Sequence, residues 1–148
     1  MRVSHISSNW TGAATNIQDS WTNITDLGTN NVFNGGSVVG SGNSSTDIVV
    51  SGSNNTIGAI TVTNSENSTV KIYITGNYNV FQGIIVTGSA NSHTAFYLDG
   101  SRNSVGGLVI TASNDAGIQV KLTGDNNTIA GGTVTASDKS QAKWTVSS

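Results

Sequence analysis

Apolar and polar residues alternate in short runs along the chain, and the runs recur at a fixed distance. Ile72 and Ile74 are separated by Tyr73, and the same alternation returns at Phe96 and Leu98 around Tyr97. Strict alternation over a few residues is typical of a β-strand with one buried face. We therefore expect strands throughout. Helical repeats are disfavoured, because they need a 3.6-residue period.

The runs are separated by a Gly-x-x-Asn unit that returns every twelve residues, with degenerate copies holding the missing places. Gly and Asn enter positive φ at low cost, so these units mark corners where the chain turns. The well-formed units lie at 28–31, 40–43, 52–55, 76–79, 88–91, 100–103 and 124–127. Alternate units differ, so two successive units make one full repeat.

Written in rows of 24, the chain shows columns of like residues. Three columns are apolar and are expected to face inward: Ile48, Ile72, Phe96, Val120 and Trp144; Val50, Ile74, Leu98, Leu122 and Val146; and Val38, Val62, Val86, Ile110 and Val134. A column of asparagines, Asn31, Asn55, Asn79, Asn103 and Asn127, falls at one corner. Its amides are suited to hydrogen-bond the backbone from coil to coil.

This repeat predicts an all-β fold, a parallel β-helix or β-solenoid with about 24 residues per coil and about five regular, right-handed coils. Residues 28–148 form the β-helix with its C-terminal end coil. Residues 1–27 break the pattern and are expected to form an N-terminal capping segment, because open solenoid ends need covering. Trp10, Trp21 and Trp144 all lie near an end and suit that role.

Composition narrows the possible partners. Ser, Thr, Asn and Gly make up more than half of the chain, only 9% of it is charged, the net charge is −2, and Cys and Pro are absent. Disulfide scaffolds are therefore excluded. The few scattered Lys and Arg residues offer no surface for nucleic acid, and no apolar stretch is long enough for membrane insertion or a signal peptide. We expect no metal site and no cofactor.

The tandem run from Asn79 to Asn91 resembles the coil pattern of right-handed parallel β-helix proteins of the pectate-lyase-like type. The Ser/Thr/Asn/Gly richness is similar to that of bacteriophage tailspikes and related receptor-binding proteins. The resemblance covers residues 28–148 in repeat style. It implies a homotrimer on the virion tail or in an extracellular setting that contacts bacterial surface polysaccharide. Tailspikes are several times longer, so a non-catalytic module that binds the glycan or stabilises the spike is expected.

The best ligand candidates are the outward-facing pair Tyr73 and Tyr97, with Lys71 and Lys121 close by. Rigid aromatic side chains with a polar tip stack on sugar faces, and they also anchor protein interfaces. The residues are thus consistent with sugar binding, a subunit interface or a plain surface ladder.

A second outward column places Ile85 and Val109 where water is expected. Exposed apolar rows tend to be covered by a partner. This predicts a subunit interface at Ile85 and Val109, matching the homotrimer implied by the resemblance.

Two other functions stay open. One is a polysaccharide depolymerase, a glycoside hydrolase or lyase with carboxylates shared between subunits. Polysaccharide hydrolysis needs two carboxyl groups roughly 5 to 10 Å apart, and Glu66 and Asp115 lie about 9.6 Å apart if they occupy one corner two coils apart. The simpler interpretation is that acidic residues replace Asn at the turn. An ice-binding or purely structural solenoid is suggested by Thr61 and Thr63, but Ile85 and Val109 interrupt the threonine array.

Overall fold

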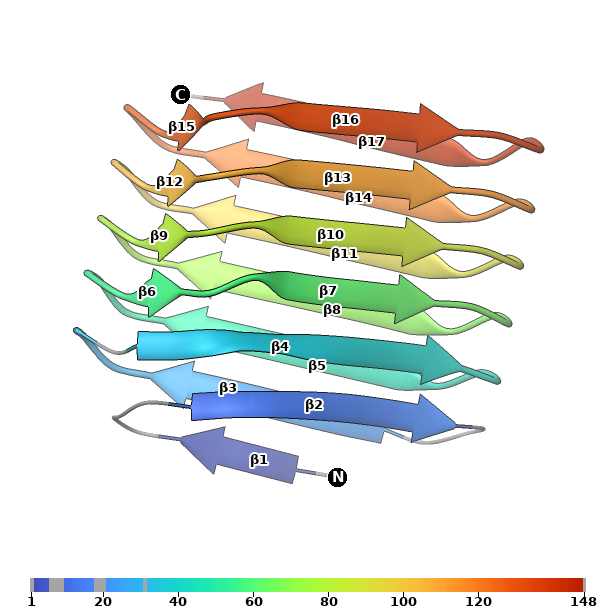
Figure 1. The fold of residues 1–148 in the computed structure, drawn as a ribbon, viewed down its shortest axis with the longest axis horizontal. Coiled ribbons are helices and arrows are strands. Elements are labelled where there is room, and N and C mark those ends of the chain that lie inside the picture. Colours follow the sequence, from blue (N-terminus) through green and yellow to red (C-terminus); the bar gives the residue numbers. More distant parts are fainter. Residues whose placement is uncertain (1, 6–9, 18–20, 31, 148) are drawn as a thin grey trace.

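The computed structural model describes residues 2–5, 10–17, 21–30 and 32–147, with the side chains of residues 28–30, 32, 34–143 and 145–147. It confirms an all-β parallel solenoid of about five turns (Figure 1). No helix in the described part is long and apolar enough to cross a membrane.

Seven strands form one face of the solenoid, each pairing in parallel with the strand of the next coil. Their order in the sheet is β1 (Arg2–His5), β3 (Trp21–Leu27), β5 (Ser45–Ser51), β8 (Thr69–Thr75), β11 (His93–Asp99), β14 (Gly117–Thr123) and β17 (Gln141–Ser147).

The second sheet has ten strands and covers the opposite side (Figure 1). Its longer strands are β2 (Trp10–Ile17), β4 (Val32–Ser41), β7 (Ile60–Asn64), β10 (Ile84–Gly88), β13 (Leu108–Ala112) and β16 (Gly132–Ala136). In later coils a short strand precedes the longer one: β6 (Thr56–Ile57), β9 (Val80–Phe81), β12 (Ser104–Val105) and β15 (Thr128–Ile129). In its coil, the single strand β4 spans the positions of both the short and the longer strand.

The predicted 24-residue register holds without a shift from β4 to β17. Tyr73 pairs with Tyr97 on one sheet, and Val62 pairs with Val86 on the other. In Figure 1 the nearer strands run left to right and the fainter, more distant strands run right to left as the chain climbs. The winding is therefore right-handed, as expected.

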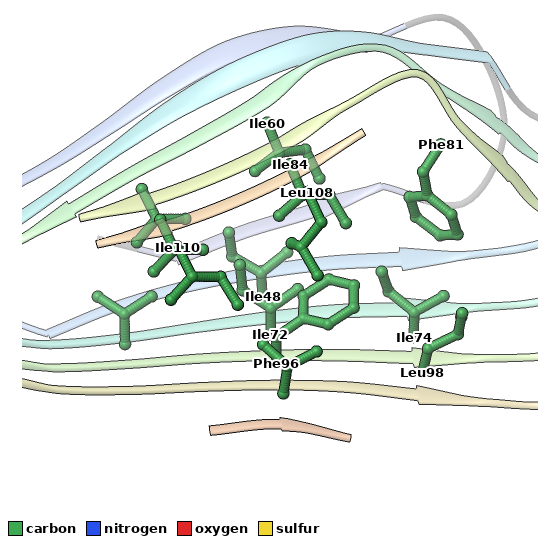
Figure 2. Close-up of a cluster of buried hydrophobic side chains, with 14 of the residues drawn as sticks. Ile48, Ile60, Ile72, Ile74, Phe81, Ile84, Phe96, Leu98, Leu108 and Ile110 are labelled. Carbon is green, nitrogen blue, oxygen red and sulfur yellow. The ribbon is translucent and has the colours of Figure 1, made fainter. Parts of the chain in front are cut away.

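The three apolar columns fill the interior and replace a single globular core. Ile72, Ile74 and Val86 are fully buried, and Phe81 adds an aromatic ring from the short strand β9. Figure 2 shows the layered packing, with Ile60, Ile84 and Leu108 from one sheet facing Ile72 and Phe96 from the other. Because like side chains lie over one another, each coil buries its apolar residues against those of the adjacent coils.

The corners carry the expected left-handed residues and the asparagine ladder. Positive φ occurs at Gly76 and at non-glycine residues such as Tyr78 and Asn91. At one corner the Asn79 Oδ1 atom accepts the backbone N–H of Asn55 at 2.9 Å, and Asn103 does the same for Asn79 at 2.8 Å. The ladder therefore pairs corner amides that the strands leave free.

The two ends of the stack differ from its middle. Val134 and Val146 belong to inward columns, and both are exposed. At the other end, β3 keeps the 24-residue register, and β2 keeps it from Gly12 onward, with an irregularity between Trp10 and Gly12. The outermost strand β1 departs from this register, because Arg2 pairs with Asn23. The described strands before residue 28 thus add further parallel pairs to both sheets. The side chains of Trp10, Trp21 and Trp144 lie outside the described ones, so their capping role stays a prediction.

Candidate functional site

Tyr73 and Tyr97 stack on the outer face of the seven-stranded sheet. Their strands β8 and β11 hold them in register, with ring centroids 5.0 Å apart and planes 9° from parallel. Such a pair contributes about 0.5–1.5 kcal/mol beyond its area burial. Each ring covers one face of the other, and the next residues of the same outward column are Val49 beside Tyr73 and Lys121 beside Tyr97.

A shallow groove of about 300 Å³ lies beside this stack, open to solvent. It crosses three coils at the carboxyl ends of β8, β11 and β14. Its floor is Ile74 and Leu98, whose side chains belong to the core, and its walls include Tyr73, Tyr97 and Lys121. The remaining lining residues are Thr75, Asp99 and Thr123. The volume is at the lower end of the range for small-molecule sites.

Polar groups on the groove wall are available to a ligand. The Tyr97 hydroxyl donates to Gln119 Oε1 at 3.1 Å, which orients that ring. The Tyr73 hydroxyl, the Asp99 carboxylate and the Lys121 ammonium make no hydrogen bond or ion pair within the described part of the chain. The groove therefore combines two aromatic rings with three polar groups, namely a free hydroxyl, a carboxylate and an ammonium group.

Three of the four predicted ligand residues line this groove, and the fourth does not. Lys71 precedes Tyr73 by two residues on β8 and is exposed, but it lies outside the groove lining. The sequence reasoning missed Thr75, Asp99 and Thr123 as lining residues. Their signal was present, because they lie two residues after the tyrosine column and so share its outward face.

The predicted interface residues lie on the other sheet. Ile85 and Val109 pair in register on β10 and β13, and their exposed fractions are 42 % and 43 %. Thr61 and Thr133 flank them in the same outward column. They form an apolar patch well separated from the groove by the solenoid core.

The two candidate carboxylates occupy a turn and lie far from the groove. Glu66 and Asp115 have φ values of 55° and 63°, and both side chains are exposed. Their corner precedes β8 and β14, whereas the groove lies where those strands end. A seven-residue strand spans about 23 Å. The structure therefore does not bring these carboxylates to the groove.

Within the described residues, no group of three or more His, Asp or Glu side chains could hold a metal ion.

In comparisons with known proteins, no protein-family model, curated protein or solved structure matches this chain.

Proposed function

We propose that the chain is a non-catalytic carbohydrate-binding module whose site is the groove beside Tyr73 and Tyr97. The observation that carries the proposal is the joint presence of a rigid aromatic stack and unpaired polar groups along one hollow. Sugars present apolar C–H faces together with many hydroxyls, so a site for them combines aromatic rings with hydrogen-bond donors and acceptors. Tyr73, Lys121 and Asp99 supply these groups.

Rigidity supports the same proposal. The groove is built on strands whose backbones pair on both sides, and Gln119 orients the Tyr97 ring. A site on rigid elements loses little conformational entropy when a ligand binds. The repeat-style resemblance to tailspike proteins supports a bacterial surface polysaccharide as the glycan, and a virion tail or extracellular surface as the setting.

The proposal is tested by a glycan array followed by calorimetry on the best glycan. Tyr97→Ala removes half of the stack and should weaken binding about tenfold or more, which corresponds to about 1.4 kcal/mol. Lys121→Ala should weaken binding as well. Lys71→Ala is the matched control, because this lysine lies on the same sheet face outside the groove.

Two results would contradict the proposal. One is the absence of binding to any glycan on the array. The other is an equal loss of affinity in the Lys71 and Lys121 variants, since that would indicate general electrostatic attraction instead of a site at the groove. Incubation of the bound glycan with the protein should leave its chain length unchanged, because Glu66 and Asp115 lie at the opposite ends of the strands.

A further inference from the structure

Two charged side chains of opposite sign line the groove beside the tyrosine stack. They are Asp99 on β11 and Lys121 on β14, and both are exposed. Within the described part of the chain, neither group forms a hydrogen bond or an ion pair, either with the other or with a third residue. Both charges therefore remain available to a ligand.

The strand register fixes where the two charges stand. Lys121 pairs with Tyr97 and Asp99 pairs with Thr123, so the charged residues belong to successive coils and lie two positions apart along the strand. Successive coils are about 4.8 Å apart, and two strand residues span about 6.6 Å. The charges therefore lie on a diagonal across the groove, at a separation that two neighbouring sugars of one chain can reach.

The other Asp and Lys side chains described on this sheet face, from β5 to β17, lie outside the groove lining. They are Asp47, Lys71 and Lys143, which share the outward column two residues before the tyrosine column. Asp99 and Lys121 are the charged residues of the lining itself. A ligand in the groove thus meets one charge of each sign.

This pair of charges disfavours a neutral ligand. A glycan in the groove removes water from both groups, and a charged group that loses water without gaining an opposite charge costs free energy. The hydroxyls of a neutral sugar can hydrogen-bond Asp99 and Lys121, but they bring no opposite charge. A ligand with an ammonium group beside Asp99 and an anionic group beside Lys121 compensates both.

We propose that the groove selects zwitterionic glycans, in which an amino sugar with a free ammonium group neighbours a sugar with a carboxylate. This inference rests on the carbohydrate site proposed for the same groove. The ammonium group pairs with Asp99 and the carboxylate with Lys121, while the edges of the Tyr73 and Tyr97 rings contact C–H groups of the sugars. Selection comes from the cost of leaving either protein charge uncompensated.

Calorimetry with four forms of one oligosaccharide tests the selection. The probe is a short chain of alternating glucuronate and glucosamine, at slightly acidic pH and low salt, where the amine is protonated and exposed charges are little screened. N-acetylation removes its ammonium groups, methyl esterification removes its carboxylates, and both changes together make it neutral. The zwitterionic form should bind about three- to tenfold more tightly than either singly modified form, and the neutral form should bind most weakly.

Variants of the protein assign each preference to one residue. In Asp99→Asn, N-acetylation of the probe should no longer weaken binding, and in Lys121→Met, esterification should no longer do so. The matched control is Lys71→Met, which lies outside the groove and should keep both preferences. Circular dichroism shows whether each variant keeps the fold.

Three results would overturn the inference. They are a neutral form that binds as tightly as the zwitterionic form, preferences that persist in Asp99→Asn and Lys121→Met, and a probe that does not bind in any form. Neutral glycan binding that Tyr97→Ala weakens would refute the charge selection and leave the carbohydrate site standing. The carbohydrate site itself fails if no glycan on the array binds, so the two failures are distinguishable.

Discussion

At the scale of single residues, the corner asparagines show how a chain with few charged groups satisfies its backbone. Asn79 is fully buried, its Oδ1 atom accepts from Asn55, and its Nδ2 group donates to the Gly52 carbonyl at 3.1 Å. Each amide therefore serves two backbone groups of the preceding coil. A buried polar group left without a partner costs about 1–3 kcal/mol.

Replacement of Asn79 should therefore be costly. We expect Asn79→Ala to lower the free energy of unfolding by about 2–4 kcal/mol, since the buried N–H of Asn55 and the partly buried carbonyl of Gly52 lose their partners. Denaturant titration measures the change. The control is Asn77→Ala, whose Oδ1 accepts an exposed N–H from Ser101 that water can satisfy instead. A similar loss in both variants would contradict a special role for the buried ladder.

Gly76 and Gly107 differ in the space that each leaves for a Cβ atom. Gly76 has a φ of 132°, and a Cβ atom there would lie 1.9 Å from the carbonyl oxygen of Gly52. Gly76→Ala should cost more than about 3 kcal/mol, because a backbone atom cannot move aside. Gly107→Ala should be neutral or stabilise by up to about 1 kcal/mol, because a Cβ there meets nothing within 4 Å. Equal melting temperatures in the two variants would refute this reasoning.

At the scale of strands, the alternation of buried and exposed side chains determines which substitutions lower stability. On β8, Ile72 is fully buried and its neighbour Lys71 is exposed. Ile72→Ala should cost about 2–5 kcal/mol through the cavity it leaves, whereas Lys71→Ala should change stability by about 0.5 kcal/mol or less. Thermal unfolding monitored by circular dichroism compares the two. A large effect of the lysine would mean that this face is covered in solution.

The sequence predicted the strands and columns well because each repeat states the same pattern again. The sequence pattern predicts burial less well where residues of different size pair between adjacent coils. Ala95 lies in an outward column and is nonetheless 3 % exposed, flanked in register by Lys71 and Gln119. The groove escaped prediction for the same reason, because its depth depends on how the Tyr97 ring and the shorter Asp99 and Thr75 side chains fill adjacent columns.

At the scale of the whole molecule, one lateral surface is suited to association, the patch of Ile85 and Val109. Alternation identified Ile85 and Val109 as outward residues, and the fold exposes them as expected. Alternation carries no information on whether another chain covers them.

The lateral homotrimer is tested by light scattering on the unaltered chain. A trimer through the patch of Ile85 and Val109 should then have about three times the 15.1 kDa chain mass by light scattering. Ile85→Asp should return it to a single chain, because a charge would be buried in the contact. Thr63→Asp, on the same outward face of β7, is a control for added surface charge. A single-chain mass before the Ile85 change would contradict the trimer.

Because the pairing offset is constant from β4 to β16, the length of this part of the chain is modular. Excision of residues 84–107 would join Gly83 to Leu108, a direct register partner of Ile84, and should yield a shorter folded protein with every remaining side chain on its former face. Excision of 84–106 would shift all later positions by one and turn their apolar residues outward. Natural gain or loss of length should therefore proceed in whole windings.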